Sequence, residues 1–185
     1  TGLFPMILFH DVGWPYGRRD MYSDPDRIPA SHRRPFAKKG MLPSAKELQA
    51  WGGLNAHEWN ATEEFSARNG VLTAIEDFLM QSSHALEFIE LPLFFGVGIL
   101  VSREMLGGRP QLCTLFQSLV PSMIIRDNLH NIESARLGLL IDAQKHHRAL
   151  SDVKQEYIQT LSSLRVSQEE QERLRQDLHR MLHSK

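Results

Sequence analysis

The apolar positions in the first 108 residues follow two periodicities, which together predict the order of the elements. Continuous apolar runs bounded by turn residues predict strands over residues 6–11 and 96–102. Alternating apolar and acidic positions predict a further strand over residues 86–91. Ahead of these last two strands, apolar residues recur at helical spacing over residues 71–79. The predicted order is therefore strand, long loop, helix, strand, strand.

The loop over residues 12–69 is long for a connection within one domain. It holds five prolines, and so long a connection with little regular structure is normally a functional lid or a disordered segment. Its seven aromatic residues argue against disorder. Within it, Ser44-Ala45-Lys46-Glu47 matches a capping box, which predicts a short helix through about Trp51. We therefore expect a lid insertion that contains one short helix.

The sequence after Gly107-Gly108 has helical periodicity throughout. A helix that begins at Pro110 is broken or kinked at Pro121, and a longer helix follows. A second capping box at residues 167–170 marks a point where this helix restarts. We expect the arm, residues 109–185, to pack on the domain of residues 1–108 or on another copy of the chain, so a homo-oligomer is the predicted state. Apolar residues spaced by three and four, as in coiled coils, are Leu150, Val153, Tyr157, Leu161 and Leu164.

Composition and charge narrow the classes of partner. The chain is 42% hydrophobic and 23% charged with a formal net charge of −1, which gives no support to a nucleic-acid partner. The longest apolar run, residues 91–101, is too short for a membrane span and is interrupted by proline and glycine. The single cysteine, Cys113, forms no intrachain disulfide and fits a reducing compartment. We expect a soluble cytoplasmic protein.

The most informative segment begins with the first predicted strand and continues into the loop. The strand ends at His10-Asp11, and ligands of open α/β sheets bind just beyond the carboxyl ends of strands. Aromatic and charged residues follow closely. The segment reads Phe9-His10-Asp11-Val12-Gly13-Trp14-Pro15-Tyr16-Gly17-Arg18-Arg19-Asp20-Met21-Tyr22.

This segment resembles the motif after the fifth strand in class I S-adenosylmethionine-dependent methyltransferases, and within that family it is most similar to the bacterial O-methyltransferase-like group. Residues 69–79 and 95–100 resemble the helix and the last strand that follow in the family. The resemblance covers roughly residues 2–108 and concerns the C-terminal half of the family fold. It implies an α/β fold with the C-terminal half of a Rossmann-like sheet: a last parallel strand, a lid insertion, a helix and antiparallel final strands, followed by the helical, coiled-coil-like arm.

The resemblance also implies S-adenosylmethionine as cofactor and an oxygen of a small or glycosyl substrate as methyl acceptor. In the family, a glycine-rich turn after strand 1 and an acidic residue after strand 2 hold the cofactor, and both lie upstream of the matching segment. This sequence contains neither. We therefore expect the cofactor to be held by an upstream half or by a partner chain.

His10 and Asp11 are the predicted catalytic residues. In metal-assisted relatives the tip of this strand carries two adjacent ligands of a divalent cation that acts as a Lewis acid, and the resemblance places His10 and Asp11 there as metal ligands. Alternatively, His10 is a general base that takes a proton from a substrate hydroxyl, because imidazole exchanges protons near neutral pH. A purely structural interpretation makes Asp11 the cap of a turn and His10 an interior histidine.

The residues that follow in the loop are the predicted substrate-binding residues, because binding residues concentrate on loops held by a rigid scaffold. Aromatic faces and guanidinium groups suit a sugar, an aromatic ring or a phosphate. Alternatively, the loop packs its own rings and pairs its arginines with nearby aspartates. The predicted residues are Trp14, Tyr16, Arg18, Arg19, Asp20 and Tyr22.

Two functions follow from these observations. The first is the C-terminal portion of an O-methyltransferase that contributes the strand tip and the substrate-binding lid. The second is a non-catalytic interaction or oligomerisation module derived from that fold, in which an exposed strand edge pairs with a partner and the arm self-assembles.

Overall fold

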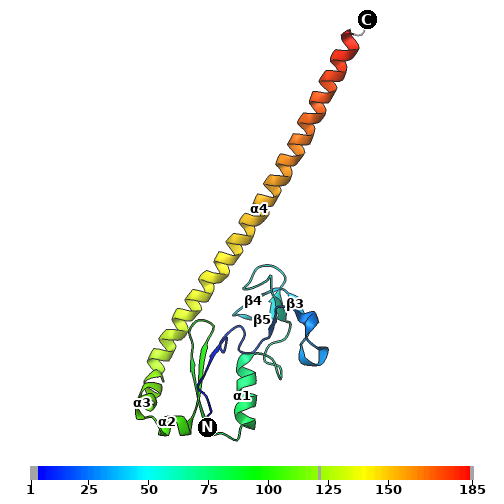
Figure 1. Ribbon diagram of the computed structural model, residues 1–185. Coiled ribbons are helices and arrows are strands. Elements are labelled where there is room, and N and C mark those ends of the chain that lie inside the picture. Colours follow the sequence, from blue (N-terminus) through cyan, green and yellow to red (C-terminus); the bar gives the residue numbers. More distant parts are fainter. Residues whose placement is uncertain (1–3, 121, 184–185) are drawn as a thin grey trace. The chain divides into compact units, whose positions relative to one another are not determined.

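The computed structural model describes residues 4–120 and 122–183, which divide by their contacts into two units at residues 144 and 145 (Figure 1). The strands are β1 (Ile7–His10), β2 (Met21–Tyr22), β3 (Phe36–Lys38), β4 (Gly40–Leu42), β5 (Ala45–Gln49), β6 (Trp59–Ala61), β7 (Leu86–Leu91) and β8 (Val97–Ser102). The helices are α1 (Val71–Gln81), α2 (Arg103–Gly107), α3 (Pro110–Leu119) and α4 (Met123–His183), and two short 3-10 turns span Pro25–Arg27 and Ala30–His32.

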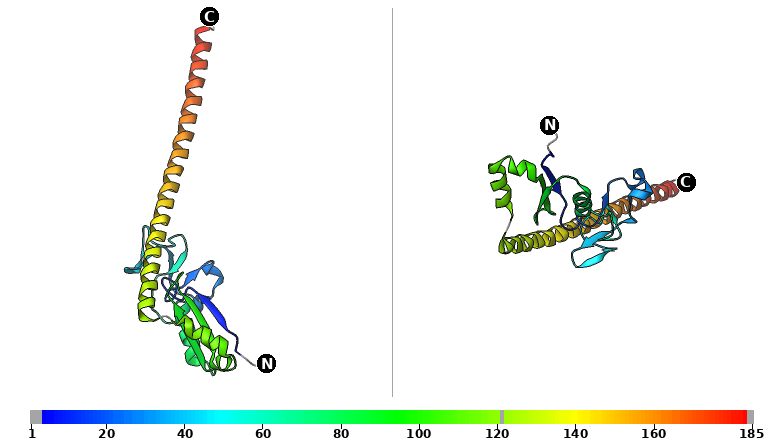
Figure 2. Two further views of the ribbon diagram at one scale, coloured as in Figure 1. Left: turned by 90° about the vertical axis from the view of Figure 1, so that its left-hand side faces the viewer. Right: turned by 90° about the horizontal axis from the view of Figure 1, so that it is seen from below.

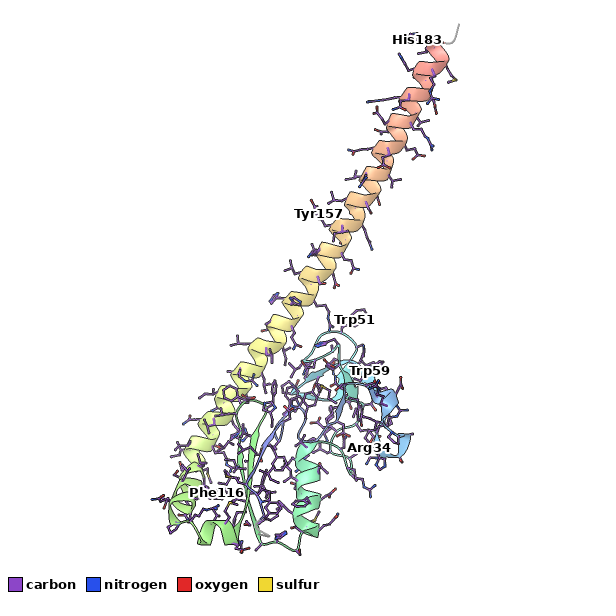
Figure 3. The ribbon with its side chains drawn as sticks, viewed as in Figure 1. Arg34, Trp51, Trp59, Phe116, Tyr157 and His183 are labelled. Atoms are coloured by element: carbon purple, nitrogen blue, oxygen red, sulfur yellow. The ribbon has the colours of Figure 1, made fainter. Side chains whose placement is uncertain are left out.

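The largest sheet contains β1, β8 and β7 in that order, and β8 is antiparallel to both neighbours. Side chains of β8 alternate between the two faces, as the period of two in a strand requires. On one face Ile99 and Val101 pack with Leu106 of α2 and Phe116 of α3. Figure 1 shows α2 and α3 on this side of the sheet and α1 on the other, and Figure 3 labels Phe116. The sheet is thus covered on both faces.

The second face of the sheet carries Leu100, which is fully buried, together with Ile7 and Phe9 of β1. These residues border an apolar groove whose other wall is α1, with Ile75 and Phe78. The right-hand view of Figure 2, from below, also shows α1 beside the strands. The helical spacing that predicted α1 is therefore the spacing that places its apolar residues on the sheet.

The predicted fold class is wrong. We expected a last parallel strand at the edge of a Rossmann-like sheet, but in the described residues all strand pairs are antiparallel and form three small sheets, followed by the long helix α4. β1 and β7 run in the same direction, yet β8 lies between them, so they form no hydrogen bonds with each other. β1, the strand expected to be parallel, is an edge strand whose neighbour in the sheet is β8, and β8 runs in the opposite direction.

The loop over residues 12–69 is more ordered than predicted. β2, β6 and β3 form one small sheet, and β4 and β5 form a hairpin. The capping box that predicted a helix through about Trp51 lies instead at the start of β5, so this prediction is wrong. A helix of so few residues is marginal by itself, and here Leu42 pairs with Ala45 across the hairpin while Arg19 binds the Lys46 carbonyl oxygen at 2.6 Å.

Helix α4 continues without interruption past the second predicted capping box, so the predicted restart at residues 167–170 does not occur. The predicted break at Pro121 falls on a residue outside those described. Among residues 4–120 and 122–183, no helix combines the length and the apolar character needed to cross a bilayer.

Candidate functional site

His10 is the last residue of β1, and Asp11 follows it in a left-handed backbone conformation with φ of 64°. This conformation is uncommon outside glycine, although aspartate tolerates it better than most residues. It brings Asp11 Oδ1 to 2.9 Å from His10 Nδ1. The imidazole remains 61% exposed and its ring lies edge-on to Phe95, with 6.1 Å between the ring centroids. The strand tip thus presents an accessible histidine–carboxylate pair.

The β7–β8 connection packs closely against the chain that follows Asp11. Gly13 N donates to the Phe95 carbonyl oxygen at 2.6 Å, and Val12 N donates to that of Gly96 at 3.3 Å. Gly96 has a φ of 87°, and a Cβ there would lie 2.1 Å from Gly13 N. Only glycine permits this approach, because its backbone is free to adopt positive φ and it carries no side chain. The two segments therefore form one rigid rim.

A pocket of about 410 Å³ opens at this rim. Trp14 contributes to its wall from the segment after β1, and Glu90 contributes from the end of β7. His130 and Glu133 line it from α4, and Pro43 lines it from the β4–β5 turn. The end of β7, the loop over residues 12–69 and the first part of α4 therefore line the same pocket.

Glu133 fixes the first part of α4 at the pocket. Its carboxylate accepts hydrogen bonds from Phe94 N at 3.1 Å and Phe95 N at 2.8 Å, and it also pairs with Arg136 at 2.6 Å. The bond to Arg136 is the main reason that the pKa of Glu133 is lowered, and the two backbone bonds act in the same direction. Arg136 lies over the Phe95 ring, 4.5 Å from its centroid. A single buried carboxylate thus joins helix and turn.

The two predicted arginines are held by ion pairs inside the chain. Arg18 makes a two-pronged pair with Glu76 of α1, at 2.5 and 2.6 Å, and this bond raises its pKa and lowers that of Glu76. Arg19 is 2% exposed, lies 3.2 Å from Glu64, and donates at 2.5 Å to the Ala61 carbonyl oxygen. This arrangement agrees with the alternative in which the loop arginines pair within the chain. Their partners are the glutamates Glu76 and Glu64, however, and not the nearby aspartates.

The two predicted tyrosines and Asp20 are also engaged within the loop. Tyr16 is buried, and its hydroxyl donates to Asn60 Oδ1 at 3.2 Å and accepts from Asn55 Nδ2 at 2.8 Å. Tyr22 donates to Asp20 Oδ2 at 3.0 Å, while Asp20 Oδ1 accepts from the backbone N–H that precedes α1, at 2.7 Å. Of the six predicted substrate-binding residues, Trp14 is the one that lines the pocket. Substrate contact by the others stays a prediction.

The described residues do not fit a complete metal site. No group of three or more histidine, cysteine, aspartate or glutamate side chains lies close enough to hold an ion in the part of the chain that the structure describes. His10 and Asp11 alone provide two ligands, and they already face each other.

The described residues do not fit a complete S-adenosylmethionine site either. In the family that the sequence resembles, the cofactor lies on a glycine-rich turn after one strand and on an acidic residue after the next. β1 is followed by Asp11 and the loop, β7 by the turn to β8, and β8 by α2, whose start is capped by Ser102. None of these three strands leads into a glycine-rich turn and helix.

Several residues of the pocket have no counterpart in the sequence-based prediction. Glu90 belongs to the alternating pattern of β7, where an acidic residue indicates only a wetter face. His130 and Glu133 lie on α4, and no motif links that helix to the strand tip. Gly96 is the one local signal, because glycine readily adopts positive φ; the structure shows that Phe94 and Phe95 share this conformation, which brings backbone N–H groups together.

Comparison of the chain with protein-family models, with curated proteins and with solved structures gave no match.

Proposed function

We propose that this chain is the C-terminal portion of an S-adenosylmethionine-dependent O-methyltransferase, in which it supplies the general base and the pocket for the methyl acceptor. The observation that carries the proposal is the exposed His10–Asp11 pair at the end of β1, together with a pocket of about 410 Å³. His10 and Asp11 do not line this pocket themselves, but the His10 ring contacts the ring of Phe95, which does. The acceptor is a small or glycosyl molecule with a free hydroxyl. The cofactor is held by a segment or chain outside these residues.

The His10–Asp11 geometry suits a base better than a metal ligand. A carboxylate 2.9 Å from Nδ1 favours the proton on that nitrogen and leaves the lone pair on Nε2. This is the role that a carboxylate has beside a histidine base, where it fixes the tautomer and stabilises the imidazolium. His10 Nε2 then takes the proton from the acceptor hydroxyl, and Asp11 stabilises the charge that forms on the ring.

The pocket suits a hydroxyl-bearing ring. Trp14 offers an aromatic face on which the apolar side of a sugar or an aromatic ring packs, and Glu90 offers a carboxylate that accepts hydrogen bonds from hydroxyls. Phe95 lines this pocket, and its ring also contacts the His10 ring edge-on. Acceptor binding and proton removal are therefore assigned to neighbouring groups on one rim.

The outer side of β1 supports a partner for this chain. β1 is an edge strand of its sheet, and Leu8 in its middle is 67% exposed. The apolar groove between β1 and α1 has a volume of about 280 Å³ and leaves Phe78 44% exposed. An open edge with exposed apolar residues invites pairing, and we assign this surface to the segment or chain that holds the cofactor.

A second candidate is a non-catalytic module whose role is self-association. The observation in its favour is the part of α4 over residues 145–183, in which every side chain is exposed although many are large and apolar. Self-association through this part is compatible with either function. Binding of S-adenosylhomocysteine, the product formed from the cofactor, distinguishes the two candidates.

The first experiment determines the intact mass of the polypeptide as its source makes it, and then tests that polypeptide, with any co-purifying chain, for stabilisation by S-adenosylhomocysteine. The proposal predicts a higher melting temperature with the ligand, because binding to the native state stabilises it. It also predicts transfer of a labelled methyl group from S-adenosylmethionine to a member of a panel of glycosyl and small hydroxyl acceptors. The variant His10→Ala should lower kcat by about 100-fold or more while the stabilisation by S-adenosylhomocysteine stays unchanged.

The chain offers a matched control for this variant. His57 and Glu58 form a second adjacent histidine–carboxylate pair, with 3.2 Å between Nε2 and Oε1 and 65% of the histidine side chain exposed. Neither His57 nor Glu58 lines the pocket, so His57→Ala should leave kcat unchanged. Full activity of a His10→Ala, Asp11→Ala double variant would refute the base assignment. Absence of any stabilisation by S-adenosylhomocysteine in the native polypeptide would favour the non-catalytic module.

A further inference from the structure

The part of α4 over residues 145–183 has an apolar stripe with heptad spacing. If Leu150 is assigned to position a of a heptad, positions a and d over residues 150–181 hold seven apolar residues and three polar ones. The apolar residues are Leu150, Val153, Tyr157, Leu164, Leu174, Leu178 and Met181, and the polar ones are Thr160, Ser167 and Gln171.

These apolar residues are exposed. Leu150 is 69% exposed and Leu174 is 65% exposed, and Figure 3 shows Tyr157 on the surface of the helix, where it is 62% exposed. Helices of this length normally owe their stability to the packing of an apolar face rather than to helix propensity. A partner of matching length and periodicity is therefore required, and a second copy of this helix meets both conditions.

The charges beside the stripe determine the orientation of that second copy. Position g carries the acidic residues Glu156, Glu170 and Asp177 as well as Ser163, whereas position e carries the basic residues Lys154 and Arg175 as well as Leu161 and Gln168. In a parallel pair, position g of one helix faces position e of the other five residues later, so Glu170 meets Arg175. In an antiparallel pair, position g faces g and position e faces e, so acidic residues meet acidic ones and basic residues meet basic ones.

We propose that residues 150–181 form a parallel, in-register, two-stranded coiled coil with a second copy of this chain, in which Glu170 of each copy pairs with Arg175 of the other. The inference rests on the self-association proposed above and adds its orientation and register. The polar residues Thr160 and Gln171 reduce the apolar area of the seam, and a buried polar position favours one register over others. The coil holds two copies of the N-terminal residues in one assembly, with both chains running in the same direction.

Cysteine cross-linking of the full chain tests the orientation. In a Cys113→Ala background, Thr160→Cys and Gln171→Cys are made separately, and each variant is oxidised mildly at a concentration where sedimentation shows a dimer. A parallel in-register pair predicts disulfide-linked dimers from both variants, because each position a or d faces itself. An antiparallel pair brings at most one of the two positions opposite itself. Glu172→Cys, on the outer face at position b, is the matched control and should not cross-link.

Charge reversal tests the assigned ion pair. Glu170→Arg and Arg175→Glu should each raise the Kd of the dimer by about 5- to 30-fold, since two pairs are lost and replaced by repulsion. The double variant should return to the original Kd, and an equimolar mixture of the two single variants should form a heterodimer. Glu169→Arg, at the outward position f, should change the Kd less than 2-fold by the same rule for exposed charges.

Each outcome separates the inference from the proposals on which it rests. A dimer that cross-links at one of the two positions only, or that is indifferent to charge reversal at 170 and 175, overturns the parallel register and leaves self-association standing. A clean monomer at all concentrations overturns both. Neither result bears on stabilisation by S-adenosylhomocysteine, so the methyltransferase proposal is tested separately.

Discussion

Buried polar side chains hold the lid together at the scale of single residues. Asn60 is fully buried, and its amide donates to the carbonyl oxygens of Lys39 and Asn55, at 2.9 Å each, while its Oδ1 accepts from Tyr16. Asn69, also fully buried, accepts from the backbone N–H of Asp20 at 2.7 Å. Among the described residues, every buried side-chain nitrogen and oxygen has a hydrogen-bond partner. Hydrogen bonds thereby help to order this loop, and each of them is costly to break in a buried site.

Tyr16 gives this network a dependence on pH. Burial raises the pKa of its hydroxyl from 10.0 to about 12, so the folded state holds the proton more tightly than the unfolded state. The stabilisation from this residue is fully present below pH 10 and is lost as the pH rises from about 10 to 12, because the unfolded chain then ionises first. Tyr16→Phe should remove this loss. It should also lower the free energy of unfolding at pH 7 by about 1–3 kcal/mol, because Asn60 and Asn55 lose a partner.

Urea unfolding at pH 7, 9 and 11 measures both effects. An unchanged alkaline slope in Tyr16→Phe would contradict the role assigned to the buried hydroxyl.

The elements around the pocket are joined by close backbone contacts. The β7–β8 turn lies against the segment after β1 at Gly96, and the first part of α4 binds the same turn through Glu133. Both contacts depend on local geometry: one needs a residue without a side chain, and the other needs two neighbouring N–H groups that point outward. The pocket is therefore as rigid as the turn that forms its rim.

Two glycine-to-alanine substitutions should have opposite effects. Gly96→Ala should destabilise the chain by about 2 kcal/mol or more, because an L-residue is strained at positive φ and the new Cβ meets the Gly13 backbone. Gly138→Ala should stabilise it by about 0.5–1 kcal/mol, since Gly138 lies within α4 and a Cβ there meets nothing within 4 Å. Chemical denaturation followed by circular dichroism at 222 nm measures both. Equal effects at the two positions would contradict the close approach at Gly96.

At the scale of the molecule, the chain combines a mixed N-terminal unit with a helical unit that begins at Lys145. The unit boundary lies within α4, and the residues of α4 up to 144 contribute to the N-terminal unit. Gln144 donates to Asn55 Oδ1 at 3.0 Å and accepts from Asn55 N at 2.8 Å, and Glu133 lies further back on the same helix. Residues 145–183 bury no side chain.

Truncation should separate the two units. A chain that ends at Gln144 should keep the melting temperature of the N-terminal unit to within about 2 °C, because no buried contact is removed, and it should be monomeric. A chain that ends at Ser122 loses Glu133 and Leu137 as well and should melt at a clearly lower temperature. Differential scanning calorimetry and sedimentation measure these properties. A large loss of stability on removal of residues 145–185 would contradict the division.

The sequence by itself determined those elements whose periodicity is strong and local. The residues of β1, α1, β7, β8 and α3 all follow apolar spacing that each segment carries within itself, and the long helix follows from the same signal. The tertiary structure decided which strands are neighbours, because pairing depends on chain direction and on what lies between two strands. It made β5 a strand despite a capping box, since hairpin pairing and Arg19 outweighed a helix of one or two turns. It also brought Glu90, His130 and Glu133 to one pocket, because contacts between residues far apart in the sequence leave no local pattern by which to recognise them.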